Sequence, residues 1–306
     1  MPVISGLHHV TAFAKDPAAN LRFYTSVLGL KLVKRTVNFD DPFTYHLYYG
    51  DRIGTPGTLL TFFPQPRSAR GRYGVPEIGE IDLAVEPGSL GQWEGRLSLA
   101  GVPTQRVRDE TGERLHFHDP DGIRLALIER SSASGHSGAL PVDRVTLHVP
   151  NAKATVTFLT KTLGFTHSDE SDGRHELVLG PADAAASGGI GGRITVLQAT
   201  TAAASTMGAG SVHHVAWRVP NEAAQKAAAQ AILSAGIAVT PIIDRQYFHS
   251  IYFRIPGGMV FEIATDAPGF DIDEPAELLG TSLKLPPQHE PRREEIQRHL
   301  LPLGSA

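Results

Sequence analysis

The sequence predicts an α+β fold in which four βαβββ modules form two domains of paired modules, with open, cleft-forming mixed β-sheets. Three observations predict it. The segment GLHHVTAF at 6–13 returns as SVHHVAW at 211–217, far along the chain. A strand, a capped helix and three short strands recur four times. The hairpins HDPDG at 118–122 and IPGG at 255–258 place proline and glycine at matching positions of the second and fourth modules.

The first two modules follow one another in the N-terminal part of the chain. Module one opens with a strand at 7–13, and Asp16 and Pro17 are typical of the N-cap and first position of a helix that ends at Gly29. Short strands continue to Phe63. Module two is more divergent, and its expected elements are a strand in IDLAVEP, a helix near 90–99, and strands at 114–118 and 123–128.

Modules three and four repeat this order, with Asn151 and Asn221 as the helix N-caps. The small, polar segment SSASGHSGALP has the composition of a linker. We therefore expect an N-terminal domain of modules one and two, a C-terminal domain of modules three and four, and a tail that packs on the body or on another subunit. The expected boundaries are 1–130, linker 131–141, 142–266 and tail 267–306.

Composition limits the classes of function. The 306 residues carry a net charge of -4 and are 41% hydrophobic, which is typical of a globular protein and offers no basic surface for nucleic acid. No cysteine occurs, so a metal would be held by His, Asp or Glu. The N-terminus lacks an export signal and no apolar run is long enough to span a membrane, so we expect a cytoplasmic protein.

The repeated histidines predict a metal site. Because side chains alternate along a strand, His8 and His9 are expected to face opposite sides. Aligning the modules gives two sets of corresponding positions. The first set lies in the opening strand of each module and consists of His9, Asp82, Arg144 and His214. The second set lies at the fourth position after the hairpin glycine and consists of Thr61, Ala126, Val196 and Glu262.

Ligand-type side chains coincide in both sets only in modules one and four. His9, His214 and Glu262 would form a facial set of two imidazoles and one carboxylate that leaves coordination positions open. The alternative is that each histidine is an ordinary hydrogen-bonded strand residue. The equivalent site between modules two and three has no ligand set, and we expect Asp82 and Arg144 to form an ion pair there. His148 and the remaining histidines lack support from the repeat, and His249 lies near the proposed site in sequence.

These motifs resemble the vicinal oxygen chelate superfamily, which includes glyoxalases, bleomycin resistance proteins and extradiol dioxygenases. LHHVTAFAKDP, FYTSVLGL, VHHVAW, DRQYFHSIYFR and FEIATD are similar to the hydroquinone-type ring-cleaving dioxygenases in particular. The resemblance implies Fe(II), or sometimes Mn(II), on His9, His214 and Glu262. It also implies a site lined by His8, Thr11, His213, Arg245 and Tyr252.

The implied reaction is insertion of the co-substrate O2 into the ring of a small para-diol. Arg245 would supply a fixed positive charge, and His213 or Tyr252 would handle protons. Two alternatives stay open. A glyoxalase-like lyase or isomerase normally surrounds its metal with four protein ligands, and Thr61 stands at the place of the fourth. A drug-binding member would use a similar cleft without metal ligands. Association into a homo-oligomer is a further expectation, because open sheet edges favour it.

Overall fold

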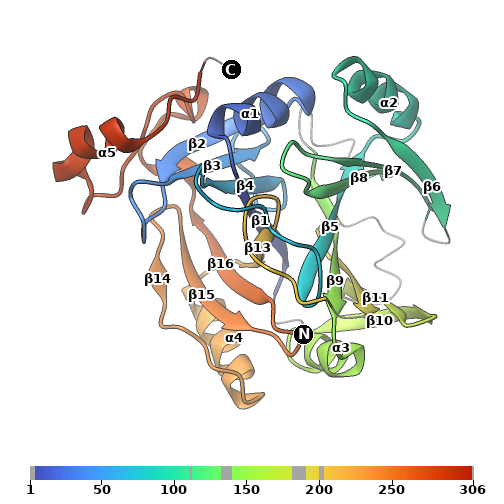
Figure 1. Cartoon of the computed structure of the whole chain (residues 1–306). Coiled ribbons are helices and arrows are strands. Elements are labelled where there is room, and N and C mark those ends of the chain that lie inside the picture. Colours follow the sequence, from blue (N-terminus) through green and yellow to red (C-terminus); the bar gives the residue numbers. More distant parts are fainter. Residues whose placement is uncertain (1–3, 110–111, 132–139, 181–190, 200–202, 305–306) are drawn as a thin grey trace.

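The computed structural model describes residues 4–109, 112–131, 140–180, 191–199 and 203–304, which form two eight-stranded mixed sheets (Figure 1). The first sheet has the order β14-β15-β16-β13-β1-β4-β3-β2. Its strands are β14 (Ile243–Asp244), β15 (Phe248–Arg254), β16 (Val260–Pro268), β13 (Val212–Val219), β1 (Gly6–Ala14), β4 (Leu59–Pro64), β3 (Tyr45–Gly50) and β2 (Lys31–Val37).

The second sheet has the order β10-β11-β12-β9-β5-β8-β7-β6. Its strands are β10 (Phe165–Ser171), β11 (Arg174–Leu179), β12 (Arg193–Gln198), β9 (Val142–Val149), β5 (Glu77–Val85), β8 (Arg124–Glu129), β7 (Gly112–His118) and β6 (Gln105–Asp109). Few helices accompany the sheets, so the α+β class and the four βαβββ modules are confirmed.

The modules pair differently from the expected domains. The first sheet joins module one to module four through the antiparallel pair β1–β13, and the second joins module two to module three through β5–β9. Each sheet therefore joins one module from the first half of the chain to one from the second half. Each module leaves the edge of its first strand open, and that edge must pair with another first strand. The pattern within one module does not say which. Most of the expected linker, residues 132–139, lies outside the described residues.

The helices begin where their caps predict. The side chains of Asp16, Asn151 and Asn221 each accept a hydrogen bond from the backbone N–H three residues later. The helices are α1 (Pro17–Arg22), which continues as a π-helical turn over Phe23–Val27, α2 (Leu90–Leu99), α3 (Ala152–Lys161) and α4 (Glu222–Ser234). Apolar side chains from both sheets and these helices form a main core cluster, including the fully buried Trp217.

The described part of the tail packs on module one. Lys34 of β2 is fully buried, and its Nζ lies 2.6 Å from a carboxylate oxygen of both Asp273 and Glu274. Leu283 continues the contact through a bridge to Arg35, and the tail contains the short helix α5 (Arg293–His299). The expectation that the tail packs on the body is confirmed for these residues. No helix among the described residues has the length and apolarity needed to cross a membrane.

Candidate metal centre

Two matching β-bulges shape the centre of the first sheet. In the β1–β13 ladder, Leu7 pairs with Trp217 and His9 with Ala216, so His8 is an extra residue without a partner opposite it. His213 is the extra residue on the other strand. A bulge bends the strand and redirects its side chains. The regular alternation expected at the His-His pairs is therefore wrong: Nδ1 of His8 lies 2.9 Å from Nδ1 of His9, and the His213 and His214 Nδ1 atoms are 2.7 Å apart.

Three buried ligand atoms converge between β1, β13 and β16. Nε2 of His9 lies 3.2 Å from Nε2 of His214, and Oε2 of Glu262 lies 3.5 Å from the first and 2.9 Å from the second. Three facial ligands at about 2.1 Å from one ion stand about 3.0 Å apart, so these separations suit a divalent cation.

The Glu262 carboxylate has one oxygen without a hydrogen bond. Its side chain is fully buried, and its Oε2 makes no hydrogen bond although both imidazoles face it. Burial alone would raise the pKa of Glu262, but His9 and His214 reverse the effect and hold that pKa well below its usual value. The carboxylate is therefore ionised, and an ion bound by the three side chains would give its free oxygen a partner.

The outer nitrogens fix the orientation of both imidazoles. If Nε2 of His9 and His214 offers its lone pair to an ion, each Nδ1 carries a proton and donates it to Nδ1 of the neighbouring His8 or His213. Burial, and to a smaller extent the adjacent imidazole, lowers the pKa of His8 and of His213 to about 3. Both neighbours are therefore neutral acceptors, and His8 also hydrogen-bonds the backbone of Thr265.

A cavity of about 400 Å³ lies over the three ligands. Its rings come from β1, β3, β4, β13, β15 and the loop after β2, and its polar groups include Arg245 and Tyr252. The aromatic lining residues are Phe13, Phe39, His46, Tyr48, Phe63, His213, Phe248 and Tyr252. A cavity of this size with flat apolar walls and few polar groups suits a small aromatic molecule.

Arg245 is held at the edge of this cavity. Its Nε donates to the Tyr252 hydroxyl at 3.2 Å, and its Nη2 lies 3.1 Å from the Asp40 carboxylate. The neighbouring Tyr252 and Asp40 keep the pKa of Arg245 above its usual value against the effect of burial. Burial, and to a smaller extent the negative charge of Glu262, raises the pKa of Tyr252, so this hydroxyl keeps its proton.

The matching position in module one carries a hydroxyl in place of a carboxylate. Thr61 pairs with Thr11 on β1 as Glu262 pairs with Ala216 on β13, so the two residues are equivalent in the repeat. The Thr61 hydroxyl lies 2.7 Å from that of Thr11 and 2.9 Å from Nε2 of His46. Module one therefore contributes one ligand, and the centre has three.

A profile of the Glyoxalase/Bleomycin resistance protein/Dioxygenase superfamily matches residues 6–127 and 142–269, which is most of the chain. The chain belongs to this superfamily.

Among superfamily members, the similar proteins include several that are named as dioxygenases. One relative from Bacillus subtilis (strain 168), named "Putative ring-cleaving dioxygenase MhqE", is 42% identical over 302 residues, covering 95% of this chain and 96% of its own. The chlorohydroquinone/hydroquinone 1,2-dioxygenase of Sphingobium indicum is 32% identical over 314 residues, covering 96% of this chain and 95% of its own.

Solved structures of the superfamily agree with the fold. The crystal structure of a putative dioxygenase from Bacillus subtilis superposes with a TM-score of 0.92 at 38% identity. The match covers 98% of this chain and 97% of the other. Glyoxalase I from Zea mays gives a TM-score of 0.63 at 16% identity over 85% of this chain and 92% of its own, which shows the fold alone.

Sequence reasoning missed three residues of the centre. His46, Tyr48 and Ser250 had no support as single positions, yet Nδ1 of His46 lies 2.8 Å from the Tyr48 hydroxyl, and Ser250 Oγ donates to Glu262 Oε1 at 2.5 Å. The repeat could have found them. Tyr48 faces Thr61 as Tyr252 faces Glu262, which makes His46 the counterpart of Ser250.

Other candidate positions do not line the cavity over the ligands. His8, although its Nδ1 contacts that of His9, borders a different, smaller cavity, and the Thr11 hydroxyl contacts that of Thr61. His249 pairs with Glu222 at 2.9 Å and does not line the metal cavity. His148 lies on β9 in the second sheet, beside Gly79.

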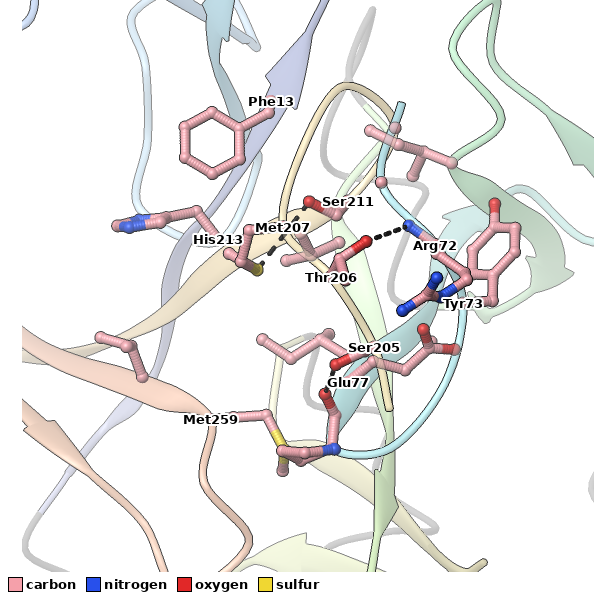
Figure 2. A pocket seen from close by; sticks show the side chains of 18 of the residues that line it. Phe13, Arg72, Tyr73, Glu77, Ser205, Thr206, Met207, Ser211, His213 and Met259 are labelled. Atoms are coloured by element: carbon pink, nitrogen blue, oxygen red, sulfur yellow. Dashed lines mark hydrogen bonds between the residues drawn. The ribbon is translucent and has the colours of Figure 1, made fainter. Parts of the chain in front are cut away.

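His213 borders two cavities. Besides the metal cavity, it lines a second cleft of about 360 Å³ together with Phe13 and Val260, which are also shared. Figure 2 shows Phe13 and His213 on one side of this cleft and Arg72 and Tyr73 on the other. His213 therefore forms part of the wall between the metal cavity and this second cleft.

The positions of the second sheet that correspond to His9, His214 and Glu262 do not form a ligand set of two histidines and one carboxylate. Arg144 Nε lies 3.8 Å from Asp82 Oδ2, so the expected contact is confirmed, although Arg114 is the nearer partner at 2.9 Å. The strand register corrects two positions of the alignment, Asp82 as the counterpart of His9 and Val196 as that of Glu262. Asp82 pairs with Ala126 as Thr11 pairs with Thr61, which makes Glu80 the counterpart of His9. The corresponding place to Glu262 is likewise Thr195, since Thr195 pairs with Thr146, two residues after Arg144.

Proposed function

We propose that this protein is an Fe(II)-dependent ring-cleaving dioxygenase that inserts both atoms of O2 into the ring of a hydroquinone-type para-diol. One observation carries the proposal: three buried, facially arranged ligand atoms lie below an aromatic-lined cavity, with no fourth protein ligand among the described residues. A ferrous ion held there would supply the electron transfer that lets O2 react with a closed-shell ring. Mn(II) would fit the same donors.

The aromatic walls would position the diol. Phe63 and Phe248 flank the cavity on β4 and β15, and Phe248 lies 5.3 Å from the His9 ring, centroid to centroid. A flat ring bound between such side chains would be held by stacking and by exclusion of water. Its hydroxyl groups would then be fixed relative to the ligand side chains.

Arg245 and Tyr252 would manage charge and protons. Arg245 carries a fixed positive charge, held in place by Asp40, where negative charge would develop on the reacting oxygens. The Tyr252 hydroxyl accepts from Arg245 and keeps its own proton, so it can donate that proton to an oxygen in the cavity. We assign the proton-donating role to Tyr252, while His213, with its low pKa, would orient His214.

A lyase or isomerase of the glyoxalase type fits these residues less well. Such members normally use a second carboxylate ligand, and the hydroxyl of Thr61 is committed to Thr11 and His46. A purely sequestering protein would not need an ionised, buried carboxylate without a hydrogen bond to one of its oxygens.

Oxygen uptake tests the proposal. The protein, reconstituted anaerobically with Fe(II), is expected to consume O2 with hydroquinone and chlorohydroquinone and far more slowly with catechol, while Glu262→Ala consumes none. Absence of uptake with every diol, despite bound iron, would contradict ring cleavage and favour the lyase.

A further inference from the structure

A second cluster of ligand-type side chains lies on the edge hairpin of the second sheet. Strands β10 and β11 are joined by a two-residue turn, in which Asp172 has φ 46 and Gly173 has φ 77. Both values are those of a type I′ turn, which matches the twist of the flanking strands. Figure 1 shows this hairpin projecting from the body at the end of the second sheet, away from β13 and β16.

A bulge in β10 brings the cluster onto one face. In a regular strand, His167 and Glu170 would point to opposite faces, because they are three residues apart. The ladder shifts between His167 and Asp169, which inserts one extra residue, while Glu170 pairs directly with His175 on β11. His167, Glu170 and His175 therefore share one face of the hairpin.

The three ligand atoms have the spacing of a metal site. Nδ1 of His175 lies 3.3 Å from Nε2 of His167 and 3.5 Å from Oε2 of Glu170, and all three atoms lie within 4.8 Å of one another. These separations resemble those of the buried centre, where the corresponding values are 3.2, 3.5 and 2.9 Å. The His175 side chain is only 13% exposed, whereas that of Glu170 is 60% exposed, so an ion there would keep water on its open side.

The charge around the hairpin favours a cation. Asp169, Asp172 and Glu176 lie in the same hairpin, and Arg174 is bound to the Glu176 carboxylate at 2.7 Å. Two imidazoles and one carboxylate suit borderline ions such as Zn²⁺, Ni²⁺ and Cu²⁺, whereas Mg²⁺ and Ca²⁺ prefer sites made of oxygen alone.

We propose that His167, Glu170 and His175 form a second divalent-metal site, selective for Zn²⁺ and similar ions over Mg²⁺ and Ca²⁺. An ion there would tie the edge strand β10 to β11. The site belongs to the other sheet from His9, His214 and Glu262, so it does not depend on the proposed function.

Counting bound zinc tests the proposal. The metal-free protein is dialysed against Zn²⁺ with Mg²⁺ in large excess. Bound zinc per chain is then measured by inductively coupled plasma mass spectrometry. We expect two zinc ions in the wild type, one in His175→Ala, one in His214→Ala and none in the double variant. His167→Ala, which changes a more exposed side chain, is the second hairpin variant, and circular dichroism checks that each protein is folded.

Amide hydrogen exchange and zinc affinity locate the second ion. In the His214→Ala background, Zn²⁺ should slow amide hydrogen exchange in β10 and β11, and His175→Ala should weaken zinc binding by at least about tenfold. Two zinc ions retained in both His175→Ala and His167→Ala would overturn the proposal. A single zinc ion in the wild type that disappears in His214→Ala would overturn it as well.

Discussion

Replacing Ser250 by alanine should weaken metal binding without disturbing the fold. Ser250 is fully buried, and its hydroxyl donates to Oε1 of Glu262 at 2.5 Å, which leaves Oε2 directed at the two imidazoles. A hydrogen bond to a charged group contributes about 1.5–3 kcal/mol, and about 1.4 kcal/mol corresponds to tenfold in affinity. We therefore expect Ser250→Ala to bind a divalent ion about 10- to 100-fold more weakly, the range typical of residues that orient a metal ligand.

Titration of the metal-free protein with Co²⁺, followed by visible absorption and competed against a chelator, measures this change. Thr195→Val is the matched control, because it also removes a fully buried hydroxyl bonded to a carboxylate, that of Glu176, but in the second sheet. The control should keep the wild-type affinity. An affinity of Ser250→Ala within about twofold of the wild type, or an equal loss in the control, would show that the Ser250 hydroxyl does not orient Glu262 for metal binding.

Four further outcomes are expected. Arg245→Gln should lower kcat for a para-diol by about 10²–10³ with metal content unchanged, as measured by oxygen uptake. Thr61→Glu should keep the metal but suppress oxygen uptake, because a second carboxylate, as a fourth ligand, would close the open side. Lys34→Met should lower the free energy of unfolding by about 3–5 kcal/mol in urea titrations, because it leaves two carboxylates of the tail without their cation. Burial raises the pKa of Asp119 from 3.8 to about 6. The contribution of this carboxyl group to stability is therefore present below about pH 4 and is lost as the pH rises through 6. Between pH 4 and pH 7, the free energy of unfolding of Asp119→Asn should rise by up to about 3 kcal/mol relative to that of the wild type.

Each of these expectations has a result that would contradict it. Loss of metal from Arg245→Gln would mean that the residue supports the centre and not the reaction. Unchanged uptake by Thr61→Glu would show that the new carboxylate does not reach the ion. A Lys34→Met protein as stable as the wild type would mean that the tail is held by its apolar contacts, and a constant stability difference for Asp119→Asn across this pH range would refute the raised pKa.

Local signals predicted the local structure well. The helix starts at Asp16, Asn151 and Asn221 follow from side chains that satisfy the first backbone N–H groups, which requires only neighbours in sequence. The coincidence of His9 with His214 across the repeat likewise predicted the three atoms that meet in the structure.

Features that depend on pairing between distant strands were not predictable from the same patterns. The bulges at His8 and His213 exist only because β1 and β13 lie side by side, and that pairing joins the first module to the last. The place of His46 in the site was not predictable for a related reason. Its two ring nitrogens contact the hydroxyl groups of Thr61 and Tyr48, and the contact with Thr61 forms only once the strands pair in the folded sheet.

We propose that this chain opens an aromatic ring with both atoms of O2 by means of His9, His214 and Glu262. The most direct measurement is mass spectrometry of the product formed from hydroquinone under ¹⁸O2 by the Fe(II)-loaded protein, with Glu262→Ala alongside. We predict a ring-opened acid that carries two labelled oxygen atoms, and no such product from the variant. A ring-opened product that carries fewer than two labelled atoms, or a labelled product formed equally by Glu262→Ala, would contradict the account.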